Sequence, residues 1–404
     1  MLRVFEAFSG YGSQSIALRN LGIEHEVVAI SEIDKYAIKA YEAIHGPVLN
    51  LGDISKIDVN DIPEHDLFTY SFPCQDLSVA GKQAGLGEGT RSGLLYECEK
   101  VIEAKKPKYL LLENVKNLVG KKFKADFDKW LEYLEELGYT NYWQVLNAKD
   151  YGVPQNRERV FVVSILGDHK PYKFADKMPL DKCIADILEE QVDEKYYLSE
   201  EIQKRFKITN QNKNIIGTTK PEFRTIGQRD LVYDKNGIMG ALVATDYKQP
   251  KQIAEIDKVE RLGGVFDDEK GKHQAGSVYD KNKCAPTLDT MQGGYRQPLI
   301  VDNINVVGKL DCKGWHDIET RVYDTNGVSP TIETRNRAKY MDDVNFRIRK
   351  LTPRECFRLM GMSDDDIDKI QAVGISNTQQ YKMAGNSIVV DVLEVIFKNL
   401  FMEG

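Results

Sequence analysis

Residues 3–22 read RVFEAFSGYGSQSIALRNLG, and this order of elements recurs along the first part of the chain. The apolar run RVFEAF leads into the glycine-containing turn SGYG, and the helical pattern SQSIALRNL follows until a glycine ends it. The next stretch repeats the order, because EVVAISEI (26–33) is followed by Asp34 as a helix N-cap and by a helix through His45. A strand and a helix, twice in succession, indicate an α/β protein.

Three further apolar runs extend this alternation across about the first 170 residues. They are DLFTYSF (66–72), KYLLLEN (108–114) and RVFVVSI (159–165), with helices expected near 93–105 and 125–137. The pattern predicts a mostly parallel, doubly wound sheet, in which ligands bind beyond the carboxyl ends of the strands. Four residues fall at those ends and are expected to meet on one rim: Gly10, Glu32, Cys74 and Glu113.

Length and composition narrow the class of protein. A chain of 404 residues exceeds one comfortable core, so we expect two domains. No apolar run approaches ~18 residues and the start MLRVFEAF lacks a secretory leader, so we expect a cytoplasmic protein with no membrane span. The six cysteines form no CxxC pair and no ordered spacing, which argues against a zinc site and a disulfide framework. No metal is expected.

The charge distribution leaves two interpretations open. The net charge of -7 disfavours contact with nucleic acid, because phosphate contacts need clustered lysine and arginine. However, the stretch from Arg335 to Arg358 is strongly basic. It is either a solvated basic face or a face toward a phosphate backbone.

From about residue 186 a repeat appears. LVYDKNGIMGALVAT (231–245), SVYDKNKCAPTLDT (277–290) and RVYDTNGVSPTIET (321–334) carry tyrosines about 45 residues apart. Each copy predicts a strand, an Asp-x-Asn turn and a second strand, which is the pattern of a hairpin. The repeat either fills a domain or presents variable loops to a long ligand, and the sequence favours neither.

Two motifs follow the repeats. In LTPRECFRLMG (351–361), Thr352, Pro353 and Glu355 predict a helix that begins with a capping box. The final stretch AGNSIVVDVLEVIFKNLF (384–401) predicts a loop that leads into an amphipathic helix, which would pack on the first domain.

The stretch SFPCQDLSVAG (71–81) contains the cysteine most suited to chemistry. Pro73 stiffens the loop after a buried strand, and Gln75 with Asp76 surrounds the Cys74 thiol with polar groups, whereas inert cysteines usually have apolar neighbours. A reactive Cys74 is therefore favoured over a packing role. Its thiolate needs a positive neighbour that lowers its pKa from ~8.5.

Two nearby motifs supply partners for such a thiolate. Arg157 and Arg159, in VPQNRERVF, are the candidate cations. Glu113 ends its strand as LLLENV, where a buried carboxyl tends to stay protonated. On its own, Glu113 could equally be a helix cap or a hydrogen-bonding residue.

The glycine turn FSGYGS (8–13) resembles a nucleotide-binding loop. Gly10 and Gly12 let backbone amides approach a ligand at a helix N-terminus, and Glu32 is placed to accept hydrogen bonds from ribose hydroxyls. Ser15 stands where the third glycine of a dinucleotide motif would be. The pattern favours a nucleoside without pyrophosphate, with S-adenosyl-L-methionine as the obvious choice. The alternative is that the glycines simply make a tight turn.

Together these motifs resemble a known family. FSGYG, SEIDKYA, GDI, SFPCQDLSVAG, ENVKN, QNRERVF, LTPRECFRLMG and AGNSIVV stand, across residues 8–390, in the order found in bacterial and phage DNA (cytosine-5) methyltransferases. TYSFPCQDLS, TRSGLL and PKYLLLENVKNL are especially similar to the mycoplasma-type members that modify CG dinucleotides. The closer likeness lies in the catalytic half and does not indicate which DNA site is read.

The resemblance implies a fold and a division of the chain. The fold would be α/β, a Rossmann-like methyltransferase sheet that binds S-adenosylmethionine, with an inserted, mainly β target-recognition domain. The boundaries expected are 1–185 for the catalytic domain, 186–379 for the recognition domain and 380–404 for a segment that completes the catalytic domain.

The resemblance also implies an activity. Carbon 5 of cytosine is a poor nucleophile, and attack of the Cys74 thiolate on carbon 6 would activate it. Glu113 would hold or donate the proton at N3, while Arg157 and Arg159 would steady the nucleotide and the thiolate. The base must first be turned out of the duplex. The enzyme would be site-specific on double-stranded DNA and monomeric. It would be a solitary phage-type enzyme or part of a restriction-modification system, whose endonuclease acts on the same site without direct contact.

The family motifs imply two further sets of residues. The expected cofactor-binding set is Phe8, Gly10, Gly12, Glu32, Asp53, Pro73, Leu94, Asn386 and Ser387. The expected DNA-binding set is Gln75, Ser78, Gln228, Gln274, Arg296, Arg335 and Arg337. Of these, Gln274, or else Gln228, would fill the gap left by the flipped base, because each lies five residues before a repeat tyrosine.

One departure and two alternatives remain. Family members commonly carry one such hairpin before the TPRE segment, whereas this chain has three. A tRNA cytosine-5 methyltransferase would not need so large an inserted reader. A catalytically silent DNA-binding protein would not need Cys74, Glu113 and the two arginines.

Overall fold

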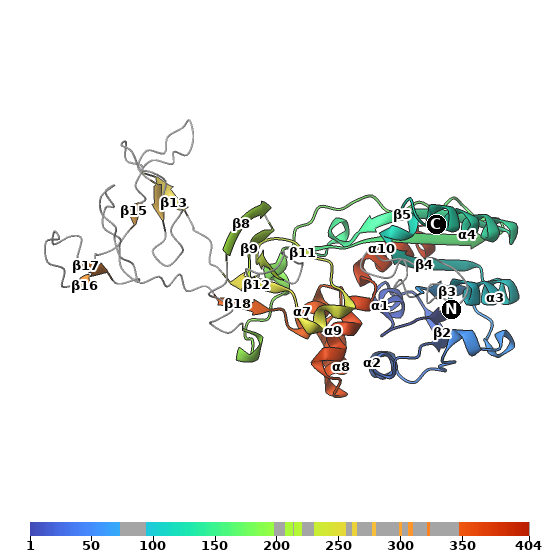
Figure 1. The fold of residues 1–404 in the computed structure, drawn as a ribbon. Helices are drawn as coiled ribbons and strands as arrows, with labels where there is room; N and C mark the ends of the chain where they lie inside the picture. The colour runs from blue at the N-terminus through green and yellow to red at the C-terminus, as the bar shows by residue number, and fades with distance from the viewer. Residues whose placement is uncertain are drawn as a thin grey trace. The chain divides into compact units, whose positions relative to one another are not determined.

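The computed structural model describes residues 1–72, 94–197, 207–212, 214–219, 230–255, 261–264, 277–279, 299–300, 306–309, 321–323 and 347–403. Their contacts divide the chain into two compact units. The first comprises residues 1–253 and 349–404, and the second comprises residues 254–348. The predicted site residues that can be located lie in the first unit. Figure 1 shows the helices and strands that carry them.

A six-stranded sheet forms the centre of the first unit, in the order β2-β1-β3-β4-β7-β5. Its strands are β1 (Leu2–Ala7), β2 (His25–Ser31), β3 (Leu67–Tyr70), β4 (Tyr109–Val115), β5 (Tyr139–Asn147) and β7 (Glu158–Leu166). β1 to β4 run parallel, and β7 runs antiparallel to both of its neighbours. The five strands expected from apolar runs are confirmed, the fold is α/β, and the sheet is mixed.

The antiparallel strand has a simple cause. Between β5 and β7 lie only the short helix η5 (Ala148–Tyr151) and the two-residue strand β6 (Gln155–Asn156). A parallel connection needs a crossover of about a dozen residues or more, usually a helix. The chain therefore turns back at this edge, and the sheet is mostly parallel, as predicted, with β7 as the exception.

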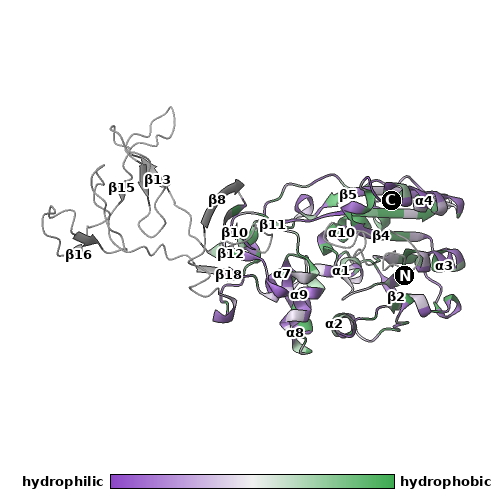
Figure 2. Cartoon of the chain, in the orientation of Figure 1, coloured by the Kyte–Doolittle hydropathy of each residue, from purple (hydrophilic) through white to green (hydrophobic). Residues whose placement is uncertain are grey.

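Helices cover both faces of the sheet. They are α1 (Ser13–Asn20), α2 (Lys35–His45), α3 (Leu95–Lys105), α4 (Lys124–Glu136), α7 (Pro353–Arg358), α8 (Asp364–Ala372), α9 (Asn377–Asn386) and α10 (Val390–Phe401). Successive strand residues enter different cores: Val4 packs with α1 and α10, whereas Phe5 packs with α3 and α4. This alternation is what a doubly wound sheet requires. Figure 2 shows the resulting mixture of hydrophobic and hydrophilic residues along helices such as α4.

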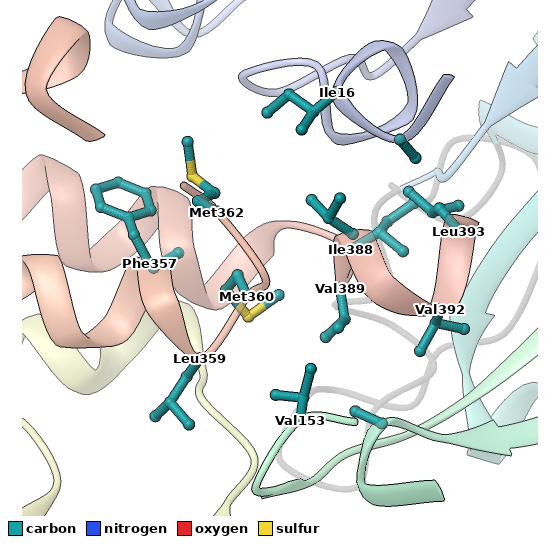
Figure 3. Close-up of a cluster of buried hydrophobic side chains, with 14 of the residues drawn as sticks. Ile16, Val153, Phe357, Leu359, Met360, Met362, Ile388, Val389, Val392 and Leu393 are labelled. Carbon is teal, nitrogen blue, oxygen red and sulfur yellow. The ribbon is translucent and has the colours of Figure 1, made fainter. Parts of the chain in front are cut away.

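The C-terminal part of the chain completes the core around the sheet. Figure 3 shows Ile16 of α1 facing Ile388 and Leu393 across one hydrophobic cluster. The predicted loop is present but short, because α9 extends through Asn386 and α10 begins at Val390. The helix predicted after it is confirmed as α10. The capping box is also confirmed, since the Thr352 side chain accepts a hydrogen bond from the backbone N–H of Glu355.

A second sheet carries the first copy of the repeat. Its order is β18-β12-β10-β9-β8, with β8 (Lys207–Asn212), β9 (Ile215–Thr218), β10 (Leu231–Asp234), β12 (Gln252–Glu255) and β18 (Arg347–Lys350). The predicted turn is present, because Asp234 Oδ1 accepts hydrogen bonds from the backbone N–H and the side-chain amide of Asn236. The predicted hairpin is not. β11 (Met239–Gly240) pairs in parallel with β6 rather than with β10.

The described parts of residues 254–348 contain short strands. They are β13 (Arg261–Gly264), β14 (Ser277–Tyr279), β15 (Leu299–Ile300), β16 (Val306–Lys309) and β17 (Arg321–Tyr323). β13, β14 and β15 form one sheet, and β16 pairs with β17. The turns of the second and third repeat copies lie outside the described residues.

The basic stretch near the end of the repeats is partly buried. The Arg349 guanidinium is fully buried and donates to both carboxylate oxygens of Glu355, each at 2.8 Å. Arg354 and Arg358 both pair with Asp364. For these three arginines neither a solvated basic face nor a phosphate-facing one describes the structure, because their charges are used within the fold.

Candidate catalytic and cofactor site

The glycine loop follows β1 in an unusual backbone conformation. Phe8, Gly10 and Gly12 all have positive φ, at 55°, 57° and 83°. A Cβ at Gly12 would lie 2.5 Å from His45 Nε2, so packing there excludes a side chain. A Cβ at Gly10 would meet nothing within 4 Å, so backbone conformation alone requires glycine. Glycine is thus favoured at both positions by local structure, and the space beside Gly10 is open.

Glu32 joins this loop to the end of β2. One carboxylate oxygen accepts the backbone N–H of Gly10 at 3.0 Å, and the other accepts those of Ile33 and Asp34, each at 2.8 Å. Asn50 holds the Glu32 backbone in place through its side-chain amide. The carboxylate is therefore fixed at the carboxyl edge of the parallel strands, where the sequence predicted it.

Ile33 and Asp53 differ in what they offer a ligand. Ile33 is 73% exposed and offers an apolar surface. The sequence reasoning missed it, because it placed Ile33 in the preceding strand. Asp53 caps the short helix η1 (Ile54–Lys56), accepts hydrogen bonds from Ser55 and pairs with Lys56. The hydrogen bond from Ser55 is the main cause that lowers the pKa of Asp53. Asp53 thus has a local structural role whatever ligand it meets.

Glu113 and Arg159 form an ion pair at the end of β4. The antiparallel register places Val115 opposite Arg159, two residues beyond Glu113. Arg159 Nε lies 3.1 Å from Glu113 Oε1, and the two side chains are 18% and 10% exposed. Burial raises the pKa of Glu113, and the charges of Arg159 and Arg157 act against that rise. The result is a carboxyl that can hold a proton yet is steadied by a cation.

The residue after Glu113 was missed by the sequence reasoning. Asn114 is buried, and its amide donates to the carbonyl of Phe72 at 3.1 Å. Phe72 lies two residues before Cys74 in the chain. The end of β4 therefore fixes the chain at the point where it enters the SFPCQDLSVAG stretch. A polar residue inside an apolar strand pattern was the available signal.

Several predicted site residues lie outside the described part of the chain. These are Cys74, Pro73, Gln75, Ser78, Gln228, Gln274, Arg296, Arg335 and Arg337. Leu94, the residue before α3, is partly buried against the core on the α3 side of the sheet.

Arg157 differs sharply from Arg159, although they are only two residues apart. Its side chain is buried, and it donates to the carbonyls of Leu242 at 2.8 Å, Ser387 at 2.7 Å and Gly385 at 3.3 Å. The guanidinium thus binds backbone of the first repeat copy and of the end of α9. Within the described residues, the ion pair of Glu113 is with Arg159 rather than with Arg157.

The end of α9 also touches the glycine loop. The hydroxyl of Tyr11 donates to Ser387 Oγ at 2.7 Å. Asn386 is exposed at the last position of α9. The structure therefore brings together the glycine loop, Glu32 and Ser387 as one group, and Glu113 with Arg159 as a second group at the end of β4, which β3 separates from β1.

Within the described residues, no group of three or more histidine, cysteine, aspartate or glutamate side chains is placed to hold a metal ion. The helices that the structure describes include none that is both long and apolar enough to cross a membrane.

Comparisons with known proteins agree on one family. Residues 2–402 match the model of the C-5 cytosine-specific DNA methylases. The type II methyltransferase M2.ScrFI of Lactococcus lactis subsp. cremoris is 36% identical, over 99% of each chain. The orphan methyltransferase M.Rho11sI of Bacillus phage rho11s is 35% identical, over 99% of this chain and 97% of its own.

Solved structures agree on the fold. The Dnmt2 methyltransferase of S. pombe is 18% identical, with a TM-score of 0.59 over 100% of this chain and 99% of its own. The methyltransferase EhMeth of Entamoeba histolytica is 16% identical, with a TM-score of 0.63 over 100% and 98%. At such identities the likeness concerns the fold alone.

Proposed function

The chain belongs to the C-5 cytosine-specific DNA methylase family and is a DNA cytosine-5 methyltransferase, and we propose that it acts through Cys74 as nucleophile, with Glu113 and Arg159 holding the target base. The observation that carries this proposal is the buried pair of Glu113 on β4 and Arg159 on β7, 3.1 Å apart. The residue after Glu113, Asn114, anchors the chain at Phe72, two positions before Cys74. Glu113 at the end of β4 is thus next to Arg159 of β7 and to the residue that holds the start of the Cys74 loop.

The proposed chemistry follows from the properties of these side chains. The Cys74 thiolate adds to carbon 6 of a cytosine that has been turned out of the duplex, forming a carbon–sulfur bond. Glu113 donates a proton to N3, so the ring becomes a neutral enamine with electron density at carbon 5. After carbon 5 has gained the methyl group, a base removes its proton and the carbon–sulfur bond breaks. Cys74 leaves as thiolate, and Glu113 recovers its proton from N3.

The electrostatics of Glu113 support that role. A carboxyl with an ordinary pKa would be ionised at neutral pH and could only accept a hydrogen bond. Burial raises the pKa of Glu113, which favours the protonated form that N3 needs. Arg159 limits the rise and keeps the carboxyl oriented toward one side through its Nε.

The glycine-loop group fits S-adenosyl-L-methionine. This cofactor, when bound, supplies a methyl group on a positively charged sulfur. We propose that the Glu32 carboxylate accepts hydrogen bonds from the ribose hydroxyls, in exchange for its bond to the Gly10 amide. The open space at Gly10 and the exposed Ile33 side chain support a planar, partly apolar ligand beside it. Phe8, Gly12, Asp53, Pro73, Leu94, Asn386 and Ser387 complete the proposed pocket.

We further propose how the protein recognises DNA and how its chain is divided. The inserted repeats would read a site in duplex DNA, with Gln274 or Gln228 filling the gap left by the flipped base, and Gln75, Ser78, Arg296, Arg335 and Arg337 contacting DNA. The names type II and orphan among the relatives support either a paired endonuclease or a solitary role. A monomer in the cytoplasm, with domains 1–185, 186–379 and 380–404, completes the proposal.

Transfer of a tritiated methyl group tests the function. We expect label on duplex DNA and none on tRNA, with Cys74→Ser losing transfer. Duplex DNA containing 5-fluorocytosine should become covalently trapped on the wild type, because the fluorine at carbon 5 blocks release of the thiol. Label on tRNA alone would favour the tRNA methyltransferase, and label on neither polymer the silent DNA-binding protein. Bisulfite sequencing of plasmid from expressing cells would identify the DNA site.

The choice of infiltrating residue has a test of its own. A 2-aminopurine beside the target cytosine becomes fluorescent when its stacking partner is removed. If Gln274→Gly and Gln228→Gly together leave that signal unchanged, these residues do not fill the gap.

A further inference from the structure

The first repeat copy is attached to the methyltransferase core by a buried junction. We use "the Arg157 junction" for Gln155, Arg157, Leu242, Gly385 and Ser387. Gln155 is completely buried, and its side-chain oxygen accepts the backbone N–H of Leu242 at 3.2 Å. Arg157 donates to the carbonyl of the same residue at 2.8 Å. Both polar backbone groups of Leu242 are therefore held by the same short stretch of chain.

Gly385 brings the end of α9 onto this segment. A Cβ at Gly385 would lie 2.3 Å from the carbonyl carbon of Val243 and 2.4 Å from the backbone nitrogen of Ala244. Such contacts are with backbone and cannot be relieved by moving a flexible side chain. The glycine is thus required by the direct contact of α9 with the segment that continues into η9 (Ala244–Lys248).

A continuous path of hydrogen bonds leads from here to the glycine loop. The Ser387 carbonyl accepts from Arg157, and the Ser387 hydroxyl accepts from Tyr11, at 2.7 Å in both cases. Tyr11 lies between Gly10 and Gly12, is 1% exposed, and packs edge-on against Phe357 with ring centroids 5.6 Å apart. The two ends of the path are the proposed cofactor loop and the repeat segment at Leu242.

The other end of the path reaches solvent. Val243 and Tyr247 are 40% and 38% exposed, and Lys248 lies over the ring of Tyr247. A rigidly mounted segment with exposed apolar, aromatic and cationic side chains can contact a DNA backbone or its sugars. Ligands could therefore act on both ends of the junction.

We infer that Arg157 is a positioning residue that couples binding at the cofactor loop to binding of duplex DNA at the Leu242–Lys248 segment. A buried guanidinium destabilises the fold unless its N–H donors are paired. If one carbonyl moves away, the donor that it leaves unpaired destabilises the whole junction. A ligand that fixes Ser387 therefore also favours the bound position of Leu242, and the reverse holds by linkage. This inference rests on the proposed function, because it takes the glycine loop as the cofactor site.

The test is a binding cycle in the Cys74→Ser background, where no chemistry can occur. Titration calorimetry would measure the affinity for S-adenosylhomocysteine, without DNA and with a saturating duplex that carries the site found by bisulfite sequencing. The parent should bind S-adenosylhomocysteine about tenfold more tightly with DNA, within the range usual for allosteric coupling. Arg157→Lys and Tyr11→Phe should each keep the affinity without DNA within about threefold and lose most of that gain.

Matched variants separate coupling from general damage. Tyr139→Phe also removes one buried tyrosine hydroxyl, which donates to the carbonyl of Pro107 at 2.8 Å away from the junction, and it should keep the full gain. Tyr11→Phe decides the question if Arg157→Lys fails to fold. An unchanged gain in Tyr11→Phe, an equal loss in Tyr139→Phe, or no gain in the parent would overturn the inference. A wild type that methylates DNA while the binding cycle shows no coupling would overturn this inference alone, whereas a wild type without methyl transfer would overturn the proposed function.

Discussion

Two buried glutamates of the central sheet show how neighbours decide what a carboxyl does. Glu6 lies inside β1, and Glu113 lies at the carboxyl end of β4. Both are buried, at 0% and 7% exposure, and burial is the main cause that raises the pKa of each. Residue type and burial therefore do not distinguish Glu113, the proposed catalytic acid, from a structural carboxyl.

The partners do distinguish them. Glu6 accepts a hydrogen bond from the hydroxyl of Ser15 at 2.8 Å, with Tyr41 close by, and its pKa rises to about 7. Glu113 faces the guanidinium of Arg159 at the rim where ligands bind. A carboxyl among hydroxyls in mid-strand holds its proton as part of the core, whereas one beside a cation at a strand end can exchange it with a substrate.

The largest expected effect comes from the same substitution at both positions. Glu113→Gln removes the proton that N3 would receive while keeping the shape of the side chain. It should lower kcat for transfer of the tritiated methyl group to DNA about 10³-fold. Glu6→Gln should change kcat less than about threefold, because an amide also accepts from Ser15. If Glu6→Gln lost as much activity as Glu113→Gln, the contrast between the two acids would be wrong.

The next effect concerns stability and pH. Glu6 has a pKa of about 7 when folded, above its unfolded value, so the folded state binds this proton more tightly. Its cost is absent at low pH and grows as pH rises from the unfolded pKa to about 7. Between pH 4.5 and 7.5 the free energy of unfolding of the wild type should fall by about 3 kcal/mol relative to Glu6→Gln.

Urea unfolding at several pH values measures this difference. Glu113→Gln serves as the matched variant, because it makes the same change at the second buried carboxyl. There the charge of Arg159 opposes the rise in pKa that burial causes. Parallel curves for wild type and Glu6→Gln across this range would show that Glu6 does not titrate with folding.

Much of this arrangement could be read from the sequence. Apolar runs located β1 to β4 and β7, and the capping residues Asp34 and Thr352 located two helix starts, because these signals are local. Parallel strands share one rim, so the order of strands and helices along the chain was enough to assign Gly10, Glu32 and Glu113 to it.

Two features were missed for different reasons. The strand β5 was not predicted. It reads YTNYWQVLN and lies at the sheet edge, where exposed polar residues interrupt the apolar run. The first repeat copy has the turn of a hairpin, but β11 finds its partner in β6, far away in the chain.

The two arginines of QNRER lie in different surroundings, which the sequence did not indicate. The family resemblance gave Arg157 and Arg159 one shared role, to steady the nucleotide and the thiolate. Only Arg159 lies within β7, whereas Arg157 occupies the bend between β6 and β7 and meets carbonyls of other segments.

The smallest expected effect sharpens the role of the cation beside Glu113. Arg159→Gln removes a charge that lowers the pKa of Glu113, so this pKa should rise further. If protonated Glu113 is the working form, activity declines at high pH as it ionises, and the variant should shift that decline upward by about one pH unit. Initial rates of methyl transfer between pH 6 and 9 would measure the shift.

Lys116→Gln is the control, because it breaks the exposed ion pair with Glu158, 2.9 Å apart at the edge of the same site. Surface pairs of that kind contribute little, so its profile should match the wild type. A decline that stays in place in Arg159→Gln, or that moves equally in Lys116→Gln, would mean that Arg159 does not set the proton affinity of Glu113.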